Sequence, residues 1–329
     1  MKLSSILPHL IALSVSAVAL CDAQDEPNIG TLRDVAVAGR IPDAGSGSGQ
    51  GDASGVPSMA GDDEFGDQVI IERVSNWYPF SLRTSLTGYR TNNAELAASG
   101  GTTDSYMRGL AALNYTPLVK GNLFADLGVS EELYRYKNLS TLDFDYQRAH
   151  AGFYYYIPPT DKPASAIFEN GFFFANYSFY RVSDNLFGPA VFKNNSVVLG
   201  FQKALSVKKG HQIFYGASTD LSFDASSQIF QRNEYRLYGG YSVNWTEDLL
   251  SQASYVASWF DYSLGTQNDW NHVAELISTW IAARPMVFGS EGEIYLEASA
   301  NFTLNDSNVG TQDYEYFTWG GGVGFRTTF

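Results

Sequence analysis

The decamer GGGVGFRTTF, Gly320–Phe329, ends the chain on an aromatic residue and is the stretch that decides the fold. Counted back by twos from the end, one set of residues is largely apolar or aromatic: Phe329, Phe325, Val323, Trp319 and Phe317. The alternate set is polar or very small and carries one charge, at Arg326. A period of two predicts a β-strand whose two faces meet different surroundings.

The same alternation recurs over long runs in the region that follows Trp77. In EGEIYLEASANFT, for example, Ile294, Leu296 and Ala298 alternate with Glu293, Tyr295 and Glu297. Strands of soluble proteins average about 5 to 6 residues, whereas a strand that crosses a membrane needs about 9 to 11. Because the runs here are the longer kind, we predict an all-β protein, a transmembrane antiparallel up-and-down β-barrel.

Twelve strands are predicted, and an even number is the rule for bacterial single-chain barrels. They cover residues 81–90, 104–116, 122–136, 141–157, 166–181, 195–204, 211–223, 233–246, 249–262, 270–284, 290–303 and 313–329. The connections after even strands read as short periplasmic turns and most of the others as longer outer loops. Both ends of the barrel are therefore expected on the periplasmic side.

The first residues resemble a cleavable export signal. Lys2 precedes an apolar stretch from Ile6 to Leu20, and cleavage is predicted before Gln24, so residues 1–23 form the signal peptide. A lipoprotein signal ending at Cys21 is the alternative. A transmembrane anchor is not expected, because the apolar stretch is short and polar residues interrupt it.

Residues 24–76 differ in composition from the barrel region. They are rich in Gly, Ser, Asp and Ala, and they carry about half of the net charge of −14. Such a segment buries too little apolar surface to fold, so we predict a disordered acidic periplasmic segment. Its acidic cluster (Asp62, Asp63, Glu64, Asp67) lacks the spacing of an EF-hand calcium loop. The only cysteine lies in the signal, which excludes disulfides and cysteine-bound metals from the mature chain.

The C-terminal strand resembles the closing strand of Gram-negative outer-membrane β-barrels. Those barrels end in an aromatic residue with apolar residues at alternate positions before it, and their assembly machinery recognises that end. Phe329, Phe325, Val323 and Phe317 match this pattern, and Thr327 matches it weakly. The resemblance covers roughly residues 77–329 and implies a porin-like class without indicating a family. It also implies that Phe325 and Phe329 act as the assembly signal.

Alternation assigns charged residues to the lumen, because an Arg or Lys that faces lipid at the membrane midplane costs about 2 to 4 kcal/mol. The candidate pore-lining residues are Arg83, Arg108, Asp126, Glu132, Arg148, Asp220, Asp224, Arg236, Glu275, Glu293, Glu297 and Arg326. His150 is assigned to the same side. Most of the arginines fall on one arc of the barrel and most of the acids on the opposite arc. That arrangement would place a field across an aqueous pore; alternatively, the charges pair with one another and fill a small lumen.

Enzyme chemistry has weaker support in the sequence. His272, near Asp269 and Asn271, is a candidate for a lipase-like rim site, but the sequence favours an interfacial polar role beside Trp270. In LDFDYQRAH, Asp143 and Asp145 share a strand face while His150 lies on the other, which argues against a protease-like site.

We therefore expect a passive, porin-like outer-membrane channel for small hydrophilic solutes or ions, with a mild preference for cations because acids outnumber bases in the barrel region. A non-conducting structural or surface-binding barrel is the alternative, and a barrel hydrolase is a third possibility. The expected partners are outer-membrane lipid and the assembly machinery. No cofactor and no metal is expected, and the acidity argues against nucleic acid.

Overall fold

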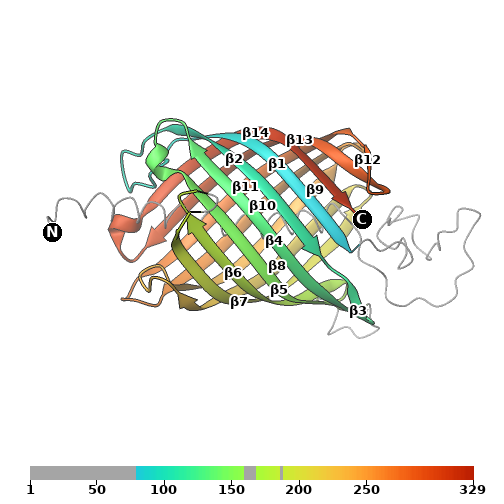
Figure 1. Ribbon diagram of the computed structural model, residues 1–329, viewed down its shortest axis with the longest axis horizontal. Helices are drawn as coiled ribbons and strands as arrows, with labels where there is room; N and C mark the ends of the chain where they lie inside the picture. The colour runs from blue at the N-terminus through green and yellow to red at the C-terminus, as the bar shows by residue number, and fades with distance from the viewer. Residues whose placement is uncertain (1–78, 159–167, 186–187) are drawn as a thin grey trace, which may run out of the picture.

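The computed structural model describes residues 79–158, 168–185 and 188–329, and these form a closed antiparallel barrel of 12 strands (Figure 1). Each strand pairs with its neighbours in the chain, and the last strand pairs with the first. The up-and-down barrel predicted from the sequence is confirmed. The predicted signal peptide and acidic segment lie outside the described residues.

The twelve barrel strands are β1 (Phe80–Thr91), β2 (Asp104–Tyr115), β4 (Leu123–Tyr136), β5 (Phe144–Tyr156), β6 (Gly171–Ser183), β7 (Ala190–Lys208), β8 (His211–Ala225), β9 (Arg232–Asn244), β10 (Leu249–Tyr262), β11 (Asn268–Ala283), β13 (Ser290–Ser307) and β14 (Tyr314–Thr328). Two short strands, β3 (Leu118–Lys120) and β12 (Met286–Val287), extend the turns beside them. Two short 3-10 helices, η4 (Ser140–Leu142) and η6 (Gly310–Gln312), lie in loops. No helix among the described residues is long and apolar enough to cross a membrane.

The largest departure from the predicted strands is β7, which starts at Ala190 and ends at Lys208 rather than covering 195–204. The sequence before Asn195 contains Pro189 and reads as a loop, but its backbone pairs with the end of β6 through a register shift at Val182 and Ser183. Pairing with a neighbouring strand therefore extends β7 where local sequence predicts a turn.

The barrel closes between β1 and β14, whose register runs from Ser81 opposite Thr328 to Thr91 opposite Thr318. We call the end of the barrel that holds Phe80 and Phe329 the terminal end, and the opposite end the distal end. In Figure 1, β1 and β14 lie side by side, with the C-terminus at the terminal end. Apart from residues 157–170, the connections at the terminal end have 2 to 7 residues and those at the distal end have 5 to 12, the direction of difference that the sequence predicts. The longest connection, residues 157–170, lies at the terminal end.

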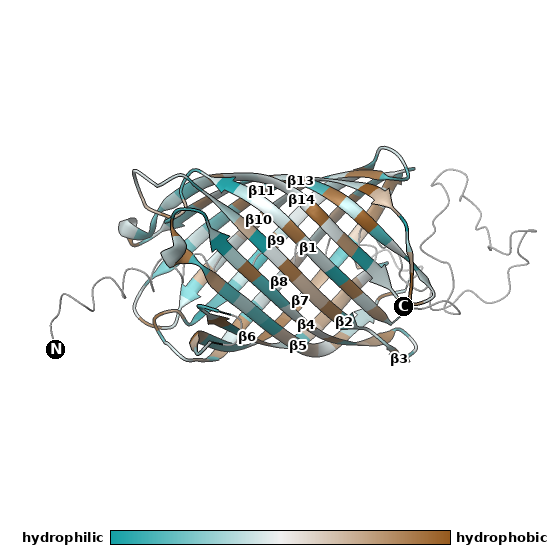
Figure 2. Cartoon of the chain, turned by 45° about the horizontal axis from the view of Figure 1, so that its top comes forward, coloured by the Kyte–Doolittle hydropathy of each residue, from teal (hydrophilic) through white to brown (hydrophobic). Residues whose placement is uncertain are grey.

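Alternation places different side chains on the two faces of every strand. On β13, Leu296 faces outward and is 44% exposed, whereas the adjacent Tyr295 faces inward and is fully buried. Figure 2 shows the same change along the strands as alternating hydrophilic and hydrophobic blocks. The outer face is largely apolar, which is the surface that lipid requires. Most of the charged and amide side chains at mid-strand face the interior.

Candidate functional site: the barrel interior

The inward faces hold most of the residues that the sequence assigns to the lumen. By strand alternation and pairing register, inward-facing residues include Arg83, Arg108, Asp126, Glu132, Arg148, His150, Asp220, Arg236, Glu275, Glu293, Glu297 and Arg326. They come from nine different strands, so only closure of the barrel brings them into one interior. Whether they line a conducting pore stays a prediction.

Asp224 departs from its predicted position. The pairing of β7 with β8 shifts between Asn195 and Ser196, so that Asn195 pairs with Asp224 while Ser196 pairs with Ser222. This bulge turns Asp224 to the outer face, where its carboxylate accepts a hydrogen bond of 2.9 Å from the Asn195 amide. An extra residue in one strand reverses the alternation beyond it, and strict counting by twos misses such a reversal.

Arginines and carboxylates pair on the inward faces of neighbouring strands. Arg108 of β2 and Glu132 of β4 approach to 2.9 Å, and Glu132 also accepts a hydrogen bond of 2.8 Å from the Tyr134 hydroxyl. The Glu132 side chain is only 2% exposed. Removing a carboxylate from water is costly unless it is paired, so the guanidinium and the hydroxyl together make this burial possible.

Two further pairs follow the same pattern. Arg326 of β14 donates to Glu293 of β13 at 2.5 Å, and Arg236 of β9 donates to Glu234 two residues before it at 2.8 Å. Arg108 and Arg326, two arginines of the predicted basic arc, are thus neutralised by acids on adjacent strands, which weakens the predicted field across the lumen. The alternative of paired charges fits these contacts better.

A polar pocket opens on the wall formed by β4 to β9. Asp126 lies 3.2 Å from the ring nitrogen Nε2 of His150 and accepts a hydrogen bond of 2.9 Å from the amide of Asn176. Nearby, Arg148 donates to the Ser178 hydroxyl at 3.0 Å. The cavity has a volume of about 40 Å³, and its other lining residues are Tyr154, Phe174, Val198, Gln202, Ser218 and Tyr238. This pocket can hold water or a few atoms of a polar solute.

Sequence reasoning missed how much of the interior is aromatic. One cluster, at the distal half of β4 to β7, consists of Tyr134, Phe144, Tyr146, Tyr180, Val182 and Phe192. A second cluster, on β8 to β11, consists of Phe214, Tyr238, Val256 and Val273. Tyrosines at inward positions of the alternation were the available signal. Their hydroxyls can bond polar neighbours while their rings fill the narrow lumen.

Inward glycines make room for several of these rings. A Cβ added at Gly240 would come within 2.2 Å of the Phe214 ring, and one at Gly324 would come within 2.3 Å of the Tyr295 ring. Side chains on adjacent strands therefore lie over the glycines and cover their backbone. The run of glycines in the C-terminal strand has this function at Gly324, where no larger residue fits.

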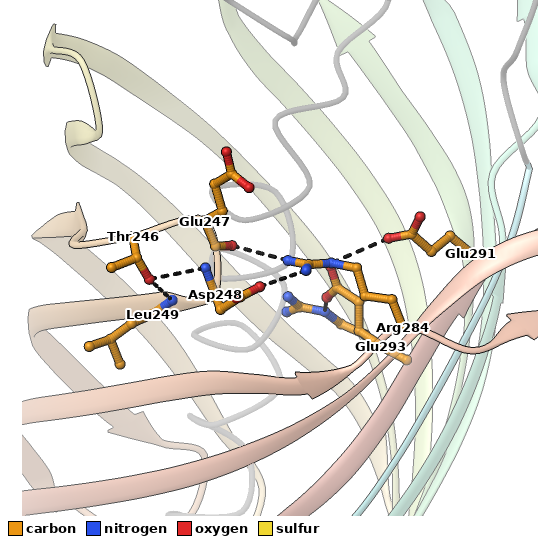
Figure 3. A network of polar contacts seen from close by, with 8 residues as sticks. Thr246, Glu247, Asp248, Leu249, Arg284, Glu291 and Glu293 are labelled. Carbon is orange, nitrogen blue, oxygen red and sulfur yellow. Dashed lines mark hydrogen bonds and ion pairs between the residues drawn. The ribbon is translucent and has the colours of Figure 1, made fainter.

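At the terminal end, one arginine joins two turns. Arg284 contacts Asp248 at 2.6 Å and Glu291 at 3.3 Å, and it donates to the carbonyl oxygen of Glu247 at 3.2 Å (Figure 3). The hydrogen bond to Asp248 raises the pKa of the Arg284 guanidinium. The hydroxyl of Thr246 accepts the backbone N–H groups of Asp248 and Leu249 in the same turn. Ion pairs and hydrogen bonds thus connect the turns at this end of the barrel.

The enzyme candidates do not assemble into a site. Asp145 faces outward and pairs with Arg135, while His150 faces inward toward Asp126. His272 faces outward, where its Nδ1 lies 2.7 Å from the Tyr255 hydroxyl, and Asn271 faces inward. Opposite faces of one strand cannot supply a nucleophile and its base. Among the described residues, no group of three or more His, Cys, Asp or Glu side chains could hold a metal ion.

Comparisons with known proteins are informative only at the level of structure. No family model and no curated protein sequence matches the chain. An outer-membrane channel from Pseudomonas putida F1 matches with a TM-score of 0.50 and 8% identity, over 78% of this chain and 99% of that one. The chain has the fold of an outer-membrane β-barrel. At this identity the likeness shows the fold and no specific family.

Other outer-membrane barrels match less closely. An anion-selective porin from Comamonas acidovorans has a TM-score of 0.32 and 10% identity, over 76% of this chain and 98% of that one. A dimer of an outer-membrane phospholipase from Salmonella typhi with bound calcium has a TM-score of 0.41 and 10% identity, over 74% and 89% of the two chains.

Proposed function

We propose that this outer-membrane β-barrel is a passive channel for small hydrophilic solutes. The observation that carries the proposal is the polarity of the interior. Charged and amide side chains face inward from the terminal end, at Arg83 and Glu293, through Asp126 and Asn176 at mid-strand. Polar walls suit water and solutes.

The location follows from the outer surface and the expected export signal. The terminal end faces the periplasm in this proposal, because the chain enters the barrel there. The C-terminal strand, through Phe325 and Phe329, engages the assembly machinery. Outer-membrane lipid is then the solvent of the apolar face.

We infer a narrow path for solutes. Aromatic side chains occupy much of the interior, and the pocket beside Asp126 and Tyr238 measures about 40 Å³. Twelve strands enclose less space than the sixteen of an open porin. These features favour ions and small polar molecules over sugars or peptides.

A mild preference for cations is part of the proposal. Three of the predicted arginines, at positions 108, 236 and 326, pair with carboxylates, whereas the inward acids also include Asp126, Asp220, Glu275 and Glu297. An acidic surplus in a low-dielectric lumen enriches cations.

Planar-bilayer recording of the purified, heat-modifiable barrel tests the channel. Discrete conductance steps are expected, and in a salt gradient the reversal potential should have the sign of cation selectivity. Silence from a folded sample would refute conduction, and an anion-selective reversal potential would refute only the preference.

The second candidate, a non-conducting barrel, is favoured by one observation. The interior clusters around Tyr146 and Phe214 place buried rings where an open channel would hold water. Silence in the bilayer together with a folded barrel would select this candidate. A hydrolase has no supporting arrangement of side chains in the part of the chain that the structure describes.

A further inference from the structure

Two cations face each other directly across a pair of strands on the outer surface of the barrel. Arg181 of β6 and Lys193 of β7 are Cα partners, and both side chains point away from the interior. Like charges directly opposite each other destabilise a sheet. Within residues 79–158, 168–185 and 188–329, neither side chain forms an ion pair with a carboxylate. Some other group must offset their repulsion.

These cations lie at the distal border of the apolar band. On β6, the outward residues run from Phe173 at the terminal end to Arg181, eight residues later. At about 3.3 Å per residue and a tilt of about 45°, that is roughly 19 Å along the barrel axis, most of the height of about 25 Å of the lipid-facing band, and long side chains can extend the remaining distance toward the headgroups. Arg181 and Lys193 are therefore placed at the level of lipid headgroups rather than of acyl chains.

On the other side of the barrel, the outward-facing residues near the distal end are of a different kind. On β9 to β11, Tyr235, Trp259 and Trp270 form a row of paired outward aromatics near the distal end. Aromatic residues are the usual choice at a membrane interface. The face of β4 to β7 instead carries charges in its distal part, with Glu131 and Gln147 on the same row as Arg181 and Lys193.

The guanidinium of Arg181 is anchored through one of its nitrogens. Its Nη2 donates to the carbonyl oxygen of Gly188 at 2.7 Å, while its Nε has no hydrogen-bond partner although it is buried from water. Beside it, Asp145 is fully buried and has one carboxylate oxygen without a partner, the other being bound by Arg135. Unpartnered polar atoms are costly at the edge of a membrane. The unpartnered Asp145 oxygen is an acceptor that repels anions, so an anion would approach Arg181 from the opposite side, where Lys193 lies.

We propose that Arg181 and Lys193 bind a phosphate group of an outer-leaflet lipid. A phosphate carries the charge that two facing cations need and supplies acceptor oxygens for their N–H groups. The acyl chains of the same lipid would lie along the apolar outer face below, at Phe173 and Tyr177, which are 45% and 44% exposed. The inference rests on the outer-membrane location and not on conduction.

The acidic residues around the patch limit where a phosphate can approach. Asp145 neutralises Arg135, and Glu131 lies two strands away from Arg181, with Gln147 between them. Asp224, turned outward by the bulge in β8, marks the other edge beside Asn195. The phosphate is thus directed to the gap between Arg181 and Lys193, the two cations of the patch that form no ion pair among the described residues.

The experiment measures lipid retained by the full chain. The wild type and the double variant Arg181→Gln/Lys193→Gln are purified and reconstituted in vesicles of phosphatidylethanolamine that contain diphosphorylated lipid A or its dephosphorylated form. Native mass spectrometry then counts the bound lipid after extraction. Lys120→Gln/Lys208→Gln is the matched control, because it removes two exposed lysines from the terminal end. Heat-modified gel migration checks folding.

The wild type and the control should retain the diphosphorylated lipid, and the double variant should bind it about 30-fold more weakly, a factor of about five for each charge. Equal retention by the folded double variant would overturn the proposal. If the double variant loses a dimer rather than a lipid, the patch is a subunit interface. If inorganic phosphate displaces the lipid, the patch is a site for the free ion. Either result also overturns the proposal. Conductance should be the same for the wild type and the variants. The lipid proposal and the channel proposal are therefore tested by separate measurements.

Discussion

Phe80 and Phe329 join the two ends of the barrel. Each donates its backbone N–H to the carbonyl oxygen of the other, at 3.0 and 2.9 Å, and their rings stack with centroids 5.4 Å apart. Phe329 also contacts the ring of Phe288 at 4.9 Å. The terminal aromatic residue therefore packs at the point where β14 meets β1, and this gives it a structural role in closure besides its expected role as an assembly signal.

Replacing Phe329 with Ala should weaken closure. The backbone pairing can remain, but two ring contacts are lost, which should cost about 1 to 3 kcal/mol. We expect conversion of the fast-migrating folded band at a lower temperature in gel-shift melting. Phe153→Ala, which removes a half-exposed ring from the outer face of β5, is the control. Equal losses in both variants would show that Phe329 matters only as apolar surface.

Replacing Gly240 with Ala should destabilise the folded barrel. The added methyl would lie 2.2 Å from the Phe214 ring and 2.4 Å from the Ala253 carbonyl oxygen, so a strand or a packed ring has to move. Overpacking of this kind typically costs about 1 to 3 kcal/mol. Gly88→Ala is the control, since a methyl there has nothing within 4 Å. Urea unfolding in lipid vesicles measures both, and an unchanged midpoint for Gly240→Ala would show that the interior is loosely packed.

Replacing Arg108 alone should lower the stability of the barrel more than replacing Arg108 and Glu132 together. Arg108→Gln leaves a carboxylate that is 2% exposed without its cation, and we expect a loss of about 3 kcal/mol. The double variant Arg108→Gln/Glu132→Gln should recover most of this loss, because the buried charge is gone as well. A double variant that is no more stable than Arg108→Gln would contradict the pairing. The same unfolding experiment supplies the numbers.

The pair at Arg326 and Glu293 should control ion selectivity in opposite directions. Their contact of 2.5 Å cancels two lumen charges near the terminal end. Glu293→Gln exposes the arginine and should shift the reversal potential toward anions, while Arg326→Gln should shift it toward cations. Glu293→Gln/Glu297→Gln should weaken cation preference further. Shifts of the same sign in the two single variants would place the pair outside the conduction path.

Loss of Arg284 should loosen the turns at the terminal end without unfolding the barrel. The guanidinium is 36% exposed, so its ion pairs contribute at most about 1 kcal/mol. Arg284→Gln should speed amide hydrogen exchange at Asp248 and Leu249, and the difference from wild type should shrink at high salt because the ion pairs are screened. The outer loop 263–267 should exchange as before. Faster exchange throughout the barrel would show a global role instead.

Local sequence was sufficient to predict the strands and most of their inward faces. Alternation has a period of two in any strand, so Tyr295 and Leu296 fall on opposite faces whatever their partners are. The length of the runs distinguished membrane-crossing strands from those of a soluble sandwich. The terminal Phe329 marked the strand that closes the barrel.

Tertiary structure alone decided which charges meet. Register between strands determined that Arg108 lies beside Glu132 and Arg326 beside Glu293, and a bulge opposite Asn195 moved Asp224 to the outer face. It also brought Arg181 opposite Lys193 on the lipid side. The physical reason is that alternation assigns a side chain only to a face, whereas its neighbours depend on hydrogen bonding to a separate strand, and a single inserted residue shifts every contact beyond it.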